Sequence, residues 1–141
     1  MISLNDLKLV FRDRLRSMSG YIGDDLVAWE GNTFTPPETV SKGTVWIKED
    51  LVPAGEQQVA TGQVVATGFI QYTVHTCKGH GGITGDALAK AIVDRFKPTT
   101  SLVGHSLEVV LEESSRAQAL EDEKWRAVPV RIEYRCYTSN P

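Results

Sequence analysis

The stretch that decides the fold runs from Gly68 to Pro98 and reads GFIQYTVHTCKGHGGITGDALAKAIVDRFKP. Its first half alternates apolar and polar side chains, with Ile70, Tyr72 and Val74 on one face, which predicts a half-buried β-strand. In its second half, apolar side chains recur every three or four residues between Ile83 and Phe96, which predicts a helix with one apolar face. A glycine-rich turn joins the two. A strand, a turn and an amphipathic helix together predict the centre of a small α+β domain.

More periodic segments flank this centre. Residues 4–18 carry an apolar stripe at helical spacing and predict a first helix. Residues 44–51, 106–112 and 128–136 alternate in the manner of strands. The predicted order is therefore α-β-β-α-β-β. We expect a single domain over residues 1–141, with a mixed, mostly antiparallel four-stranded sheet and both helices packed on one face.

Two long connections interrupt this pattern, at residues 19–43 and 52–62. The first is rich in glycine and proline, and the second is longer than a tight hairpin needs, so we expect long, flexible loops or arms that become ordered on assembly. Trp29 and Phe34 lie in the first connection. Such aromatic side chains either pack the loop onto the domain, which base rates favour, or anchor a partner subunit.

The composition limits the class of protein. The 141 residues are the length of one ordinary domain, and the formal net charge of −3 does not favour nucleic acid as the main partner. Cys77 and Cys136 fall in predicted strands, and we expect buried thiols of a reducing compartment rather than a disulfide. No apolar run approaches the roughly 20 residues of a membrane span, and the first residues lack a signal-peptide pattern. We expect a soluble protein made inside the cell.

The glycine-rich turn between Gly79 and Gly85 invites comparison with phosphate-binding loops. It lacks the lysine of a P-loop, because Asp86 and Ala87 follow Gly85. The spacing of a dinucleotide-binding loop also fails, since Thr84 stands where the third glycine belongs. We therefore expect no bound nucleotide.

His75, Cys77 and His80 form the pattern His-x-Cys-x-x-His, which offers three zinc-capable side chains. A structural zinc site needs four ligands, usually in close couples, and the remaining candidates are isolated in the sequence. A Cys–His nucleophile would also need a third group to orient the histidine, and the sequence places none there. We therefore expect no metal, no cofactor and no catalytic residue.

Two sets of charged side chains are candidates for contacts with partners. Lys8, Arg12 and Arg16 are spaced four apart on the first helix, which predicts either a solvated face or a basic ridge that meets an acidic neighbour or DNA. The last strand turns charged side chains of both signs outward, among them Arg131. Pro129 has no amide donor, so we expect this strand at an edge of the sheet or with a bulge.

Taken together, the layout resembles the tail terminator proteins of long-tailed bacteriophages, in the small tail-terminator-like family. The resemblance covers nearly the whole chain, and its more specific pieces are the Trp…Phe-Thr-Pro-Pro block and the closing Trp-x-x-Val-Pro-Val strand. The chain departs from the family where an asparagine often follows the aromatic by two residues, since Gly31 stands there and Asn32 comes next. The matching residues are Val27-Ala28-Trp29, Phe34-Thr35-Pro36-Pro37, Tyr72-Thr73-Val74, Lys78-Gly79-His80-Gly81, the helix from Ala87 to Phe96, and Trp125-Arg126-Ala127-Val128-Pro129-Val130.

The resemblance implies a structural role in the virion tail, with assembly in the host cytoplasm. Tail terminators form a ring, typically a hexamer, that caps the finished tail tube, stops its polymerisation and presents a surface to the connector proteins of the head. The implied partners are copies of this chain, the tail tube protein and a head-completion or connector protein, with DNA passing through the channel and no membrane contact. Candidate interface residues are Arg131, Glu133, Arg135, Lys8, Arg12, Arg16, Trp29 and Phe34.

Two alternatives remain open from the sequence. One is a different ring protein of the same particle, such as a head-completion, neck or tail tube protein. The other, less favoured, is a small metal-dependent or thiol enzyme built around His75 and Cys77.

Overall fold

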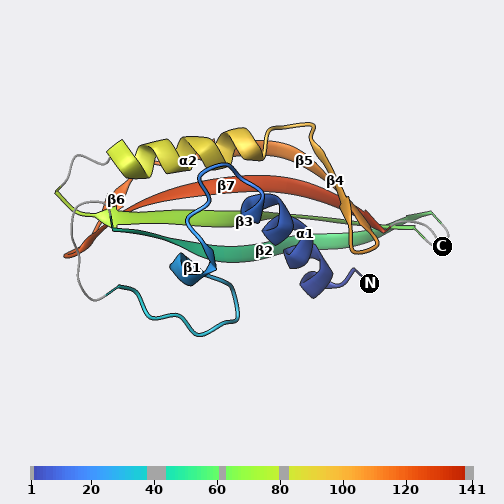
Figure 1. The fold of residues 1–141 in the computed structure, drawn as a ribbon. Coiled ribbons are helices and arrows are strands. Elements are labelled where there is room, and N and C mark those ends of the chain that lie inside the picture. The colour runs from blue at the N-terminus through green and yellow to red at the C-terminus, as the bar shows by residue number, and fades with distance from the viewer. Residues whose placement is uncertain (1, 38–43, 61–62, 80–82, 139–141) are drawn as a thin grey trace.

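A long antiparallel hairpin forms the middle of the sheet. Strand β2 (Val45–Ala60) pairs with β3 (Gln63–Cys77), and β3 pairs with β7 (Trp125–Thr138), both times antiparallel. Figure 1 shows these three strands running side by side along the length of the molecule. The computed structural model describes residues 2–37, 44–60, 63–79 and 83–138.

Shorter strands complete the sheet on both sides. β1 (Val27–Ala28) runs parallel to β2, β5 (Leu107–Arg116) pairs with β7, and β4 (Ser101–Gly104) pairs with β5. β6 (Leu120–Glu121) also pairs with β7. Across the described residues the sheet has seven strands, in the order β1-β2-β3-β7-β5-β4 with β6 beside β7.

The expected four-stranded α+β sheet is therefore wrong. The chain is mostly β, with a curved seven-stranded sheet and two α-helices in its described part. Three of the strands, β1, β4 and β6, have two to four residues each, which is too short for an alternating pattern to show in the sequence.

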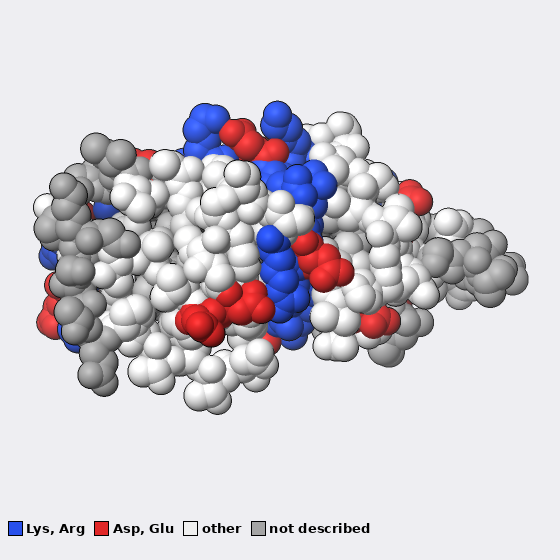
Figure 2. All heavy atoms as spheres, viewed as in Figure 1, with Lys and Arg blue, Asp and Glu red and all other residues white. Residues whose placement is uncertain are grey.

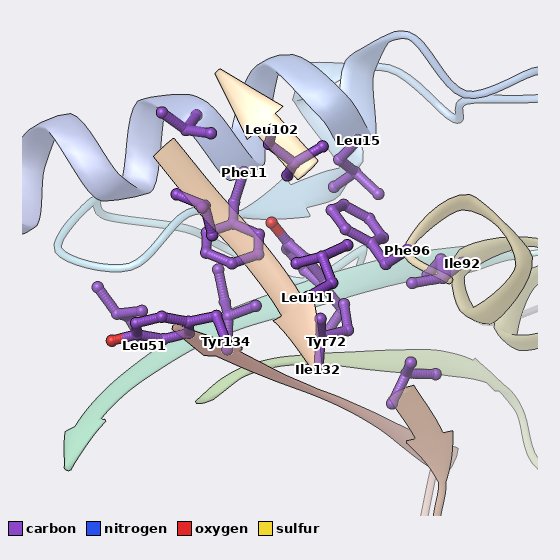
Figure 3. Packing of buried hydrophobic residues seen from close by; sticks show 14 of the residues in the cluster. Phe11, Leu15, Leu51, Tyr72, Ile92, Phe96, Leu102, Leu111, Ile132 and Tyr134 are labelled. Atoms are coloured by element: carbon purple, nitrogen blue, oxygen red, sulfur yellow. The ribbon is translucent and has the colours of Figure 1, made fainter. Parts of the chain in front are cut away.

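The two helices bring their apolar faces to the same core. α1 (Leu4–Arg16) begins at Ser3, whose side chain accepts a hydrogen bond from the Asp6 backbone N–H at 3.2 Å. α2 (Ile83–Arg95) follows the glycine-rich turn, as the sequence predicts. Figure 3 shows Phe11 of α1 between Phe96, just beyond α2, and Tyr134 of the sheet. The ring centroids lie 6.0 Å and 5.6 Å from that of Phe11, so one cluster joins both helices to the sheet.

Both expected loops contain regular structure. A short 3₁₀ helix (Asp24–Leu26) and β1 lie within residues 19–43, of which 38–43 are outside the described part. In the second connection β2 continues to Ala60, so most of residues 52–62 form a strand rather than a loop; 61–62 are outside the described part.

Pro129 sits in the interior of the sheet, because β7 has β3 on one side and β5 and β6 on the other. Of the two expectations, the edge strand is therefore wrong, and the bulge is not at Pro129 either, because the pairing of β7 with β3 runs through Pro129 without a register shift. Along β7, the pairing with β5 ends at Val130 and the pairing with β6 begins at Ala127. Pro129 lies in the gap, where its carbonyl accepts a hydrogen bond from the Ala117 N–H at 2.9 Å. A residue without an amide donor is tolerated at such an interruption.

Candidate functional site

The basic stripe of α1 is turned toward acidic side chains of the same chain. Arg12 donates through Nε and Nη2 to Glu49 Oε1, at 3.0 Å and 2.7 Å. Lys8 lies 3.8 Å from Glu30, and Arg16 lies 3.1 Å from Asp24. Figure 2 shows that, on the face that bears the helices, basic and acidic side chains meet in a narrow band across the molecule. The stripe is therefore neither a simply solvated face nor a purely basic ridge.

Glu49 is the charged group at the centre of this arrangement. Its side chain has no exposed surface, and it occupies a position of β2 whose neighbours on the same face, Ile47 and Leu51, are core residues. Besides Arg12, it accepts hydrogen bonds from the Glu30 N–H at 3.3 Å and the Tyr72 hydroxyl at 3.2 Å. A buried carboxylate requires such a set of donors. Burial, and then the Glu49 charge, raise the pKa of Tyr72 well above its usual value, so its hydroxyl remains a donor.

Trp29 packs onto the domain, as the favoured reading of its loop predicts. It is 8% exposed, and the guanidinium carbons of Arg12 and Arg16 lie 5.0 Å and 4.9 Å from its ring centroid. Such cation–π contacts stabilise by roughly 0.5–1 kcal/mol at partly exposed sites. Glu30, the next residue, accepts a hydrogen bond from the Leu51 N–H and so fixes the loop beside β2.

The Arg16–Asp24 pair is linked to a tyrosine. Hydrogen bonds from Tyr21, and then from Arg16, lower the pKa of Asp24, and the hydrogen bond to Asp24 raises the pKa of Arg16. Both Arg16 and Asp24 are substantially exposed, so this pair contributes less to stability than the Arg12–Glu49 pair.

Phe34 belongs to an aromatic cluster on the face of the sheet turned away from the helices, which we call the outer face. Its ring centroid lies 5.1 Å from that of Trp46. Trp46 in turn stacks on His75 with centroids 3.8 Å apart, and Trp125 meets Trp46 edge-on. Phe34, like Trp29, therefore has partners within its own chain.

His75 and Cys77 lie near the end of β3, where His75 belongs to the aromatic cluster. His75 is half-buried, and its burial lowers the pKa of the imidazole, so the ring is neutral at pH 7. Across the described residues, no three His, Cys, Asp or Glu side chains gather in a way that would hold a metal ion. His80, the third member of the sequence pattern, lies outside the described part. Cys77 is half-buried and Cys136 buried, both as free thiols, and burial raises the pKa of Cys136 to about 11.

Arg131, Glu133 and Arg135 do lie on the outer face. Arg131 covers the Phe69 ring at 3.6 Å and lies 3.9 Å from Glu133. Arg135 pairs with Glu112 at 2.9 Å. The three side chains retain between 42% and 51% exposure, so this strip of both charge signs is open to solvent. Of the eight candidate interface residues, these three are the ones placed on an open surface of the sheet.

Sequence reasoning missed Glu49, although the signal was present. A strand whose inward positions are Val45, Ile47, Glu49 and Leu51 places a carboxylate among core residues, which requires a buried basic partner. Arg12 is 37 residues from Glu49 along the chain, so no local pattern in the sequence links the two.

The described helices include none that is long and apolar enough to cross a membrane.

A search of curated proteins found no match. One solved structure is similar over 96% of each chain, with a TM-score of 0.73 and 20% sequence identity, which shows a shared fold. The sequence model of a family described as phage tail terminator protein matches residues 9–134, from α1 to β7. The chain therefore belongs to the phage tail terminator family and is a structural protein of the phage tail.

Proposed function

We propose that this protein forms a ring, expected to be a hexamer, that caps the end of the tail tube, stops its polymerisation and joins the tail to the head. The observation that carries the proposal is the family match, which begins within α1 and ends within β7. On this proposal the partners are further copies of the chain, the tail tube protein and a head-completion or connector protein, and DNA passes through the channel.

The surface chemistry supports a role in assembly. The outer face carries exposed arginine and glutamate side chains within one strand, from Arg131 to Arg135. Charge of both signs on one surface favours specific, oriented contacts between protein subunits, whereas binding of DNA favours a surface that is basic throughout. The buried Arg12–Glu49 pair and the packed Trp29 act within the monomer, so we assign them to holding the subunit together.

The test is the length of tail tubes made without this protein. In a phage whose copy of this gene is interrupted, electron microscopy should show tubes of variable, excessive length, and the gene supplied in trans should restore a single length. Supplying a Cys77→Ser variant should restore it equally well, since the proposal gives the thiol no chemical role. Tubes of normal length that fail only to join heads would contradict the capping role and favour a head-completion protein.

A further inference from the structure

Strand β2 has no neighbouring strand along most of its side that faces away from β3. β1 pairs only with Ile47 and Lys48, and in the described part of the chain no other strand adjoins that side. We call this side of β2, from Val52 to Val59, the β2 edge. Figure 1 shows the hairpin continuing past α1 toward the end where the C-terminus lies.

The composition of the β2 edge is unusual for a solvent-exposed edge strand. All its side chains from Val52 to Val59 are exposed, and the two valines are 41% and 53% exposed. Edge strands of monomeric proteins are commonly protected by lysine or other charges. Here Pro53 blunts the start of the edge, no lysine follows, and Glu56 is the one charged residue. An edge with a single charge and two exposed valines is suited to pairing with another strand.

The other end of the same sheet has matching properties. β4 is the terminal strand there, carries no charge, and exposes Val103 at 77%. We call the side of β4 that faces away from β5 the β4 edge. Val103 is on the outer face, since its neighbour Leu102 is buried in the core on the helix side. Val52, which follows the buried Leu51, is on the same face, and Val59 lines a hollow there with Thr67 and Arg135.

A hollow of about 300 Å³, lined by two arginines and one aspartate, adjoins the β4 edge on the helix side. It is lined by Arg14, Arg95 and Ser17 from the helices and by Leu102 from β4. Asp13 also lines it and pairs with His105 at 2.9 Å, so the two arginines are the charges there without a carboxylate beside them. The two arginines cap each other's helix: Arg14 Nε donates to the Arg95 carbonyl at 3.1 Å, and Arg95 Nε to the Arg14 carbonyl at 3.3 Å. Burial, and then the charge of Arg95, lower the pKa of Arg14. Among the described residues, neither guanidinium pairs with a carboxylate.

We propose that the β2 edge of one copy pairs with the β4 edge of the next, so that the sheet continues from subunit to subunit around the ring. Glu56 lies on the helix side, where it accepts a hydrogen bond from the Ile2 N–H at 2.8 Å, and its carboxylate then also meets the hollow of Arg14 and Arg95 in the next copy. Val103 packs beside the β2-edge valines on the outer face. This assignment rests on the proposed ring and names the surfaces that close it. The charges are complementary, and the apolar side chains of both edges fall on the same face.

The geometry of a ring favours this pairing over contact between identical edges. A closed ring with one contact per neighbour is heterologous, so each subunit needs two different and complementary patches. The β2 and β4 edges are the two ends of one strand order, β1-β2-β3-β7-β5-β4, apart from the short β1. Contact between two β2 edges would instead give a dimer and stop.

The experiment uses lysine substitutions on each edge, with the mass of the assembly in solution as the measurement. Val59→Lys and Val103→Lys place a charge on the β2 edge and the β4 edge respectively, and Glu56→Lys reverses the charge offered to the hollow. Leu120→Lys is the matched control, because Leu120 is 67% exposed and lies on β6, away from both edges. Circular dichroism on each variant checks that the fold is retained.

Wild type and Leu120→Lys should form the ring, while each edge variant alone should be a monomer, with association weakened by at least about thirtyfold. Mixing Val59→Lys with Val103→Lys should give a one-to-one dimer and nothing larger, because each variant keeps one intact edge. Rings formed normally by folded edge variants, or dimers formed by either variant alone, would overturn the proposal while leaving the ring itself in place. A wild type that stays monomeric even with tail tubes present would overturn both.

Discussion

Replacing Arg12 by leucine tests whether the buried pair with Glu49 holds α1 against the sheet. The Glu49 side chain has no exposed surface and that of Arg12 is 13% exposed, and the two are joined at 2.7 Å and 3.0 Å. Leucine keeps much of the apolar stem of arginine but leaves the carboxylate without its basic partner. The hydrogen bonds from Tyr72 and from the Glu30 N–H remain, but they do not neutralise the charge.

The expected cost follows from the burial of the pair. Removing one partner of a buried ion pair costs roughly 3–5 kcal/mol, against a total of roughly 5–15 kcal/mol for a domain. At about 4 °C per kcal/mol for a chain of this length, the midpoint of thermal unfolding should fall by roughly 10–20 °C. An exposed pair should behave differently. Lys90 and Asp94 lie 2.7 Å apart on the surface of α2, and Lys90→Leu should leave the midpoint close to that of wild type.

The assay is urea unfolding of the single variants and of the double variant Arg12→Leu/Glu49→Gln. Glutamine keeps an acceptor oxygen for Tyr72 and the Glu30 N–H but carries no charge. The double variant should therefore be more stable than Arg12→Leu alone, by roughly 1–3 kcal/mol. The reasoning is refuted if Arg12→Leu costs less than about 1 kcal/mol, or if adding Glu49→Gln lowers the stability further.

Two other predictions follow from the same structure. A Cβ on Gly68 would lie 2.5 Å from the Val52 carbonyl oxygen, so Gly68→Ala should lower the free energy of unfolding in urea by roughly 1–3 kcal/mol or more. Gly55 has open space around it, so Gly55→Ala should be near neutral. Equal effects of the two substitutions would contradict this prediction. Burial lowers the pKa of His75 in the folded chain, so as the pH falls the unfolded chain takes up this proton first. His75 therefore lowers the free energy of unfolding as the pH falls below about 6.5 and does not lower it above that pH. His75→Phe, which keeps a ring on Trp46, should flatten the stability profile between pH 7 and pH 5, and an unchanged slope would assign that slope to other groups.

The periodic part of the fold could be predicted from the sequence because burial leaves a pattern there. Ile70, Tyr72 and Val74 are fully buried on one face of β3, and Ile92 and Phe96 are fully buried in or next to α2. The stretch from Val52 to Ala60 gave no such pattern, although it is a strand, because its described side chains are exposed on both faces. Apolar and polar side chains alternate where one face of a strand packs on a core, and neither face of this stretch does so.

The short strand β4 was missed for a reason of turn chemistry. It is joined to β5 by a two-residue turn in which His105 and Ser106 have φ angles of 50° and 63°. Turns of this kind are usually marked by Asn-Gly or Gly-containing pairs, so histidine and serine give no hairpin signal. The β4 edge, and with it a surface of the proposed interface, was therefore hidden from sequence reasoning.

The candidate site could be predicted from the sequence only in part, for a similar reason. Residue type and spacing identified the open strip from Arg131 to Arg135, since alternation alone places those side chains outward. The basic residues of α1 could not be assigned, because their partners Glu30 and Glu49 come from distant parts of the chain. Their role depends on tertiary contacts that no local pattern encodes.

The central claim is that copies of this chain close on one another without any chemical reaction. Native mass spectrometry of the purified protein over a rising concentration series tests it most directly. We predict one discrete assembly, a hexamer, that replaces the monomer without an open series of larger species. A monomer at every concentration, including when purified tail tubes are present, would contradict the claim.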